Sequence, residues 1–199
     1  MIVILDYDVG NLQSLQQGFK RANMETVISR NPSVIQQADV LILPGVGAFP
    51  DAMNDLINTG LIPFINNHVL SGKVLIGICL GMQLLFDGSE EFTYTNGLGY
   101  LPGTIKELKI PDKVPHMGWN DLTIVQQDPV TMNIQNGDYV YFIHSYYADM
   151  NPEYIIATTT YGVTIPAIVR KDNIIGMQFH PEKSGTVGLN ILQAIKELI

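Results

Sequence analysis

A short stretch around the only cysteine constrains the fold of this chain more than any other feature. The apolar run Lys73–Ile78 reads as a buried parallel strand, and a helical pattern follows Cys79 up to Phe86. Gly77 and Gly81 stand two residues to either side of the cysteine. This order is typical of a nucleophile elbow, whose tight turn leaves no space for a Cβ at either flank. The sequence therefore predicts an α/β fold in which the thiol lies at a helix N-terminus, where the helix dipole stabilises a thiolate.

A lone cysteine also has a plainer interpretation. In an intracellular protein it is usually a small, buried, apolar side chain. The glycines between strand and helix favour a nucleophile, but a nucleophile needs a base and an orienting group elsewhere in the chain.

The first 86 residues alternate between short apolar strands and amphipathic helices. We expect strands at Ile2–Tyr7, Glu25–Ser29 and Val40–Leu43, and helical segments at Leu12–Ala22, Ser33–Ala38, Phe49–Ile57 and Pro63–Leu70. Ser33 is the expected N-cap of the second helix. Such alternation predicts a parallel sheet with helices on both faces.

The second half is richer in β-branched and aromatic residues. It predicts strands at Thr104–Leu108, Leu122–Val125, Tyr139–Ser145, Ile155–Thr160, Ile165–Val169 and Ile174–Phe179, and a last helix from about Gly185. Neither a linker nor a repeat divides the halves. We expect one domain, residues 1–199, with a central mixed, mostly parallel sheet of the flavodoxin-like kind, and sites beyond the carboxyl ends of its strands.

Composition narrows the function classes. The chain has 199 residues, a formal charge of −8 and one cysteine, so it forms no internal disulfide. The negative charge and scattered lysines and arginines argue against a nucleic-acid or anionic-membrane surface. The sequence shows neither a signal-peptide pattern nor an apolar run long enough to span a bilayer, and we expect a cytoplasmic protein. One cysteine and four scattered histidines give no paired metal-ligand spacing.

The best candidate for the base is His180, which closes an apolar run and precedes Pro181-Glu182. Proline favours an extended backbone before it, and residues two apart in an extended segment project to one side. Glu182 is thus expected to orient His180 toward Cys79, as in a catalytic triad. For the other histidines, His68 is expected to be solvated, and a functional role and a structural role both stay open for His116 and His144.

Acyl transfer also needs backbone N–H groups around the oxyanion. Leu80, directly after the cysteine, offers one, and the loop Pro44–Gly47 offers a second through Val46 and Gly47. The alternative for the loop is a plain β–α turn. The acidic pair Glu90-Glu91 lies in a polar loop and is expected to be solvated.

Together these motifs resemble the class I glutamine amidotransferases of the Cys-His-Glu type. The resemblance rests on Gly77–Gln83, His180–Glu182 and Pro44–Gly47. More narrowly, Asp6–Asn11, Pro115–Asn120 and His180–Gly185 resemble the glutaminase subunits of imidazole glycerol phosphate synthases. That group usually has glycine in the place of Asp8, which leaves the backbone of the first loop in question.

The resemblance implies a glutaminase that needs no cofactor. Cys79 would attack the side-chain amide of L-glutamine, His180 and Glu182 would move the proton, and Val46, Gly47 and Leu80 would hold the oxyanion. By the same resemblance, Gln83 and the segment His144, Ser145 and Tyr146 would bind glutamine.

The motifs leave no room for a domain that uses the ammonia. The resemblance therefore implies a heterodimer with a (β/α)8 cyclase subunit, which forms imidazole glycerol phosphate and AICAR in histidine biosynthesis. The residues expected near the partner are Asn11, Trp119, Asn120 and Lys183. The alternatives are a core position for the tryptophan and a solvated charge for the lysine. Two other functions stay open: the glutaminase of another synthase, such as pyridoxal-phosphate synthase, and a catalytically silent binding subunit.

Overall fold

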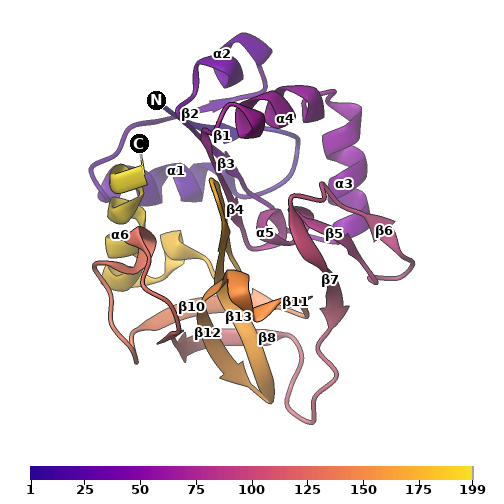
Figure 1. The fold of residues 1–199 in the computed structure, drawn as a ribbon, viewed down its shortest axis with the longest axis vertical. Coiled ribbons are helices and arrows are strands. Elements are labelled where there is room, and N and C mark those ends of the chain that lie inside the picture. The colour runs from indigo at the N-terminus through magenta and orange to yellow at the C-terminus, as the bar shows by residue number, and fades with distance from the viewer. Residues whose placement is uncertain (199) are drawn as a thin grey trace.

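The computed structural model describes residues 1–198, and its centre is an eight-stranded mixed sheet (Figure 1). The strand order is β2-β1-β3-β4-β14-β13-β12-β9, parallel from β2 to β14 and antiparallel beyond it. Its strands are β1 (Ile2–Leu5), β2 (Thr26–Ser29), β3 (Val40–Leu43), β4 (Val74–Ile78), β9 (Thr123–Ile124), β12 (Ile155–Tyr161), β13 (Val163–Lys171) and β14 (Ile174–Met177). The predicted α/β class with a central mixed sheet is confirmed.

Helices cover both faces of this sheet (Figure 1). They are α1 (Leu12–Arg21), α2 (Pro32–Gln37), α3 (Phe49–Asn58), α4 (Ile62–Leu70), α5 (Leu80–Leu84) and α6 (Gly185–Ala194), with 3-10 turns η1 (Pro129–Thr131), η2 (Pro152–Tyr154), η3 (Pro181–Lys183) and η4 (Ile195–Leu198). Neighbouring residues of a strand face opposite sides, so β1 serves two cores. Ile4 packs in the core that holds Phe19 of α1, and Val3 in the core that holds Phe49 of α3.

Two smaller sheets complete the fold. Strand β8 (His116–Asp121) pairs with β10 (Tyr139–His144), and β11 (Tyr146–Met150) joins β7 (Leu101–Glu107), β5 (Phe86–Ser89) and β6 (Thr95–Asn96). Of these, only β10 and most of β7 are predicted from the sequence. The others carry glycine, asparagine or acidic residues and are fixed by distant pairing, such as Tyr139 with Asp121. The helix expected up to Phe86 ends at Leu84, because Phe86 begins β5.

Two local predictions are wrong. Asn31, not Ser33, caps α2, because its side chain accepts a hydrogen bond from the Ser33 N–H at 2.9 Å. His68, expected in solvent, is buried in α4, and its Nε2 lies 2.9 Å from the carbonyl oxygen of Val74. A helical stretch of polar residues hides such a site, because the bond partner lies on the next strand.

The turn between β4 and α5 depends on close backbone contacts. A Cβ on Gly81 would lie 1.9 Å from the carbonyl oxygen of Leu43, and a Cβ on Gly77 would lie 2.5 Å from the carbonyl oxygen of Gly81. Real Cβ atoms do not approach other atoms so closely. The predicted need for glycine at both flanks of the cysteine is therefore confirmed.

We expect Gly81→Ala to lower the free energy of unfolding by about 3 kcal/mol or more, because an added methyl group forces β3 and α5 apart. Urea unfolding measures the loss. Gly72→Ala is the control: Gly72 has a φ of +79° and nothing within 4 Å of an added Cβ. The control reports only the strain of left-handed alanine, about 1–2 kcal/mol. A Gly81→Ala loss no larger than the control's would contradict the packing argument.

Candidate active site

Cys79 lies at the joint between β4 and α5. Its φ of 54° places a non-glycine residue in a strained region of the backbone map. The Cys79 N–H donates to the carbonyl of Met177 at 2.7 Å, and its carbonyl accepts from the Gln83 N–H at 3.2 Å. Sγ lies 3.8 Å from the carbonyl oxygen of Ile143. Bonds to β14 on one side and α5 on the other thus hold the strained residue in place.

His180 and Glu182 lie side by side, as the sequence predicts. Nδ1 of His180 is 2.9 Å from Oε1 of Glu182, and both residues are buried. The route differs from the prediction, because residues 181–183 form the 3-10 turn η3 and only His180 keeps an extended backbone. The turn, and not an extended strand, brings the carboxylate beside the imidazole.

The charge state of His180 follows from its neighbours. Burial alone would lower the pKa of this imidazole, but the side chains of Cys79 and Glu182 outweigh it and raise the pKa to about 9. The imidazole therefore carries a proton at neutral pH, beside the thiol and the carboxylate. A proton held in this position is available to a leaving group.

Glu182 is fixed by α1 and by its own turn. A Cβ on Gly18 would lie 2.6 Å from Cβ of Glu182, so only glycine lets α1 approach this closely. Arg21 of the same helix donates to the Glu182 carbonyl oxygen at 2.8 Å. Ser184 Oγ donates to the His180 carbonyl at 2.6 Å and accepts from the Tyr141 N–H at 2.9 Å. The backbone of residues 180–182 is therefore fixed by contacts with α1, Tyr141 and Ser184.

A cavity of about 350 Å³ opens in front of the cysteine. Its lining brings together ten residues predicted from the sequence, namely Val46, Gly47, Cys79, Leu80, Gln83, His144, Ser145, Tyr146, His180 and Lys183. Three further lining residues, Glu91, Pro115 and Ile143, were not predicted to belong to the site. A larger, more open hollow of about 930 Å³ lies beside β9 and η1, and its lining holds neither cysteine nor histidine. The chemistry therefore belongs to the smaller cavity.

Gln83 ties the first turn of α5 to the opposite wall of the cavity. Its Nε2 donates to the Tyr146 carbonyl oxygen and to Oε1 of Gln178, each at 3.1 Å. Tyr146 and Ser145 follow the end of β10 and lie next to His144. The segment expected to bind glutamine is thus bonded to the helix that begins directly after Cys79.

The prediction that Glu90 and Glu91 are solvated is wrong for Glu91. This residue is 8% exposed, and its Oε2 accepts from the Phe49 N–H at 2.8 Å, at the start of α3. Burial raises the pKa of Glu91 above its usual range. An acidic pair in a polar loop gives no sequence signal for this, because the partner lies on a helix that follows the Pro44–Gly47 loop.

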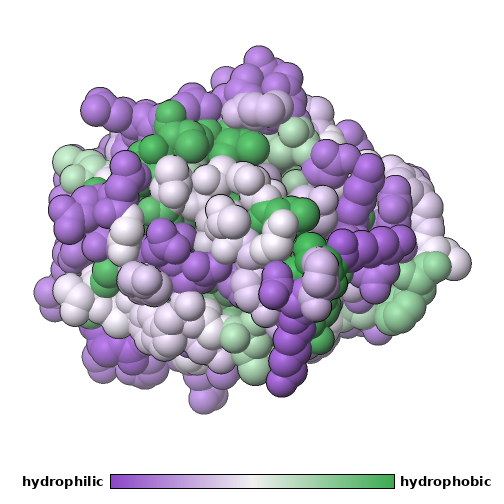
Figure 2. All heavy atoms as spheres, turned by 90° about the horizontal axis from the view of Figure 1, so that it is seen from below, coloured by the Kyte–Doolittle hydropathy of each residue, from purple (hydrophilic) through white to green (hydrophobic). Residues whose placement is uncertain are grey.

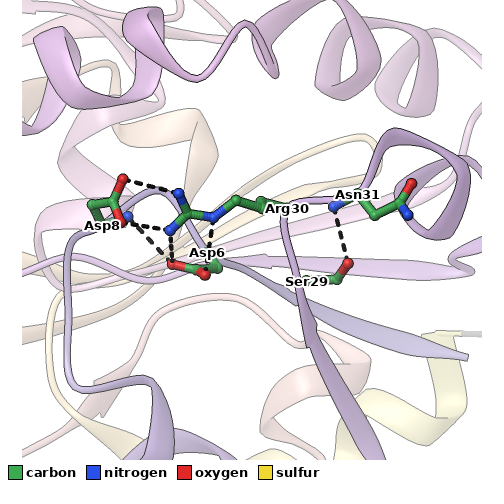
Figure 3. Close-up of polar contacts among 5 residues, drawn as sticks. All are labelled: Asp6, Asp8, Ser29, Arg30 and Asn31. Carbon is green, nitrogen blue, oxygen red and sulfur yellow. Dashed lines mark hydrogen bonds and ion pairs between the residues drawn. The ribbon is translucent and has the colours of Figure 1, made fainter.

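The first loop adopts the glycine-like backbone despite Asp8. Asp8 has a φ of 69°, and its carboxylate binds Arg30, whose Nε also donates to Asp6 at 3.1 Å (Figure 3). The hydrogen bond from Arg30 holds the pKa of Asp8 below its usual range. The hydroxyl of Tyr7 donates to the Pro44 carbonyl, so this loop braces the Pro44–Gly47 loop.

The residues expected at a partner surface lie in different surroundings. Lys183 lines the cavity, and Asn11 caps α1 by accepting from the Ser14 N–H at 3.2 Å. Trp119 is 56% exposed, which excludes the core position that was its alternative. Figure 2 shows the face that lies below in Figure 1, where hydrophobic patches alternate with polar ones. Exposed aromatic side chains of this kind are favourable contact points for a partner protein.

Neither membrane-spanning helices nor metal clusters are found in the described part of the chain. In residues 1–198 no helix has the length and apolar character needed to cross a bilayer. Within the same range, no three or more His, Cys, Asp or Glu residues are grouped so that they would hold a metal ion.

The sequence is similar to those of known proteins. Residues 3–195 fit the family described as glutamine amidotransferase class-I. The chain belongs to this family. It is 52% identical over 199 residues to "Imidazole glycerol phosphate synthase subunit HisH" of Lactococcus lactis subsp. lactis (strain IL1403), a match that covers 100% of this chain and 98% of that protein. The protein of the same name from Listeria innocua serovar 6a is 50% identical over 202 residues, with 100% and 96% covered.

Solved structures agree with the class I amidotransferase fold. A crystal structure of a glutamine amidotransferase superposes with a TM-score of 0.78 at 20% identity, covering 100% of this chain and 98% of that one. A chain in the structure of PurLQS from Thermotoga maritima gives a TM-score of 0.74 at 17% identity, covering 98% and 97%. At such identities the likeness establishes the fold alone.

We expect Glu182→Gln to lower the pKa of His180 below about 9, because a carboxylate stabilises the protonated imidazole and an amide does not. A proton NMR titration of the His180 ring measures this pKa, with His180→Asn to assign the signal. Glu90→Gln, at an exposed position, is the matched control. An unchanged His180 pKa in Glu182→Gln would show that the carboxylate does not set the charge of the base.

Proposed function

We propose that this chain is the glutaminase subunit of an imidazole glycerol phosphate synthase and hydrolyses L-glutamine to glutamate and ammonia. The main support is that Cys79 and His180 line one cavity, that Glu182 binds His180, and that the chain is 52% identical to a HisH protein over its full length. We assign the whole domain, residues 1–199, to this activity and the protein to the cytoplasm.

In the proposed reaction, the Cys79 thiolate adds to the side-chain amide carbon of glutamine. The N–H groups of Leu80 and of Val46 and Gly47 stabilise the oxyanion, each donor contributing roughly 3 kcal/mol to the lowering of the barrier. Protonated His180, oriented by Glu182, gives its proton to the amide nitrogen as the carbon–nitrogen bond breaks and ammonia leaves. Water, deprotonated by His180, then attacks the thioester, which releases glutamate and restores the thiolate.

Gln83, His144, Ser145 and Tyr146 are proposed to bind the glutamine. They line the cavity opposite or beside the cysteine, and Gln83 is bonded to the Tyr146 carbonyl. The reaction uses no cofactor, because the thiol, the imidazole and the backbone amides supply its nucleophile, acid and electrostatic stabilisation.

The ammonia is proposed to pass to a cyclase subunit in a heterodimer, through a surface that includes Asn11, Trp119, Asn120 and Lys183. Subunit naming of the HisH relatives supports a partner chain. Hydrolysis without a consumer would waste glutamine, so we expect the partner to control the site. The brace between Tyr7 and Pro44 connects the first loop to the oxyanion loop and offers a physical route.

Glutaminase turnover is expected to rise at least about 100-fold when the cyclase and its nucleotide ligand are added, which is roughly the worth of one oxyanion donor. Steady-state glutamate release by the purified chain, with and without the partner, measures the change. Equal turnover in both conditions would exclude coupling. Substituting a pyridoxal-phosphate synthase subunit tests the other assignment, since only the true partner activates the chain and consumes its ammonia.

The nucleophile is tested with an electrophilic glutamine analogue. We expect one label per chain on Cys79, seen by mass spectrometry, and loss of both label and turnover in Cys79→Ala. The labelling uses the partnered protein. An unlabelled cysteine in folded, partnered protein would favour the silent binding subunit instead.

Trp119→Ala is expected to weaken cyclase binding by about 2 kcal/mol, as typical of an exposed aromatic anchor. Calorimetric titration of the cyclase measures the dissociation constant. Tyr94→Ala is the matched control, because Tyr94 is 59% exposed beside β6 and Trp119 is 56% exposed. Equal affinities of the two variants would remove Trp119 from the partner surface.

A further inference from the structure

A chain of hydrogen bonds links strand β8 to the wall of the cavity. Nδ1 of His144 lies 2.8 Å from the Tyr146 carbonyl oxygen, and Nε2 of the same ring lies 2.9 Å from Nδ1 of His116. Nε2 of His116 in turn lies 3.2 Å from Nδ2 of Asn120. The proposed function uses His144 as one of the residues that bind glutamine and gives His116 no role.

The direction of these bonds is fixed at the cavity end. The carbonyl oxygen of Tyr146 only accepts, so Nδ1 of His144 carries the hydrogen. In a neutral imidazole the other nitrogen is then an acceptor, and Nε2 of His144 accepts from Nδ1 of His116.

The direction is also fixed at the other end. The Asn120 amide has one orientation, because its Nδ2 donates to the Thr160 carbonyl at 3.0 Å and its Oδ1 accepts from the Asp121 N–H at 3.0 Å. Nδ2 therefore donates to Nε2 of His116, which carries no hydrogen, and Nδ1 of His116 must be the donor. Both ends give the same answer: His116 and His144 are each the neutral Nδ1–H tautomer.

The surroundings favour this state. The His116 ring stacks between Tyr161, at 4.1 Å between ring centroids, and Phe142, at 4.7 Å. Both histidines are buried, which lowers the pKa of His116 to about 4 and that of His144 to about 3. An extra proton on either ring would set two N–H groups against each other.

This series of hydrogen bonds ends at the Tyr146 carbonyl, in the wall proposed to bind the substrate. The Tyr146 carbonyl accepts from His144 and also from Gln83 of α5, so it joins the two walls of the cavity. Ser145 lies between β10 and β11, Tyr146 begins β11, and both line the space in front of the thiol. A ring that turned or tautomerised at His144 would release this carbonyl.

We propose that His116 is a positioning residue for glutamine binding: through its bond to His144 it fixes the Tyr146 carbonyl and the wall on which glutamine rests. The inference depends on the proposed function, because glutamine is taken as the substrate. Asn120 anchors the outer end of the same chain, on the strand that also carries Trp119.

The first experiment determines the tautomers of His116 and His144 and does not depend on enzyme activity. Nitrogen-15 NMR of histidine-labelled wild-type protein at neutral pH is expected to show, for both His116 and His144, a protonated Nδ1 and an unprotonated Nε2. The variants His116→Asn and His144→Asn assign the signals. An Nε2–H tautomer or an imidazolium at either position would overturn the proposal, whatever the protein's activity.

The second experiment measures kcat and KM for glutamine with the cyclase present. His116→Phe keeps an aromatic ring between Tyr161 and Phe142 but leaves Nε2 of His144 without its donor, so KM is expected to rise about tenfold with kcat within about threefold. His116→Asn places an amide N–H near the lost Nδ1 and is expected to restore KM to within about threefold of wild type. His68→Phe, a buried histidine on α4, is the control and should leave KM unchanged.

The outcomes separate the two proposals. Wild-type protein without glutaminase activity beside the cyclase would refute the proposed function, while the NMR result would still decide the tautomers. Active wild type with an unchanged KM in His116→Phe would refute the positioning role alone. A His116→Phe protein that fails to fold, as seen by circular dichroism, leaves the decision to the tautomers of wild type and the KM of His116→Asn.

Discussion

The contact between Gly81 and the end of β3 is the constraint on which the site depends. A Cβ on Gly81 would meet the Leu43 carbonyl oxygen at 1.9 Å, and a Cβ on Gly45 would meet the Gly81 nitrogen at 2.7 Å. The nucleophile turn and the Pro44–Gly47 loop are therefore packed backbone against backbone. Because backbone packs directly on backbone here, a shift of one loop is expected to move the other, which couples the Pro44–Gly47 loop to the turn that holds the thiol.

His180, the proposed base, comes from a part of the chain far from Cys79 in the sequence. The carboxylate that orients it lowers the stability of the fold. Within residues 1–198, Oε2 of Glu182 has no hydrogen-bond partner, and burying such an oxygen is unfavourable. The other oxygen of this carboxylate, Oε1, pairs with His180, whose pKa the carboxylate helps to raise to about 9. If other donors bound this carboxylate, the fold would be more stable, but the carboxylate would stabilise the His180 imidazolium less. The close approach of Gly18 leaves little room for the Glu182 side chain to turn away from His180.

Features encoded by local spacing were predictable from the sequence, and features made by distant pairing were not. The elbow around Cys79 and the pair His180–Glu182 each depend on residues a few positions apart, so strand, turn and helix patterns were enough to find them. The burial of Glu91 was missed because its bond partner, Phe49, lies 42 residues away in the sequence. Strand β8 was missed because its pairing with the separate strand β10 fixes it. Even for the pair His180–Glu182, the predicted backbone was partly wrong, because a 3-10 turn replaces the extended segment after His180.

One cavity thus holds two buried histidines in opposite charge states, and their partners explain why. His180 faces the carboxylate of Glu182 and the sulfur of Cys79, whose negative forms favour a proton on the ring, so its pKa rises despite burial. His144 faces a carbonyl oxygen and a neutral imidazole, which leave burial as the dominant influence, and its pKa falls to about 3. The proton that the proposed reaction needs is therefore confined to the side of the cavity that carries His180. The opposite wall is hydrogen-bonded in a fixed direction and does not compete for that proton, so it is free to act as a rigid surface for the substrate.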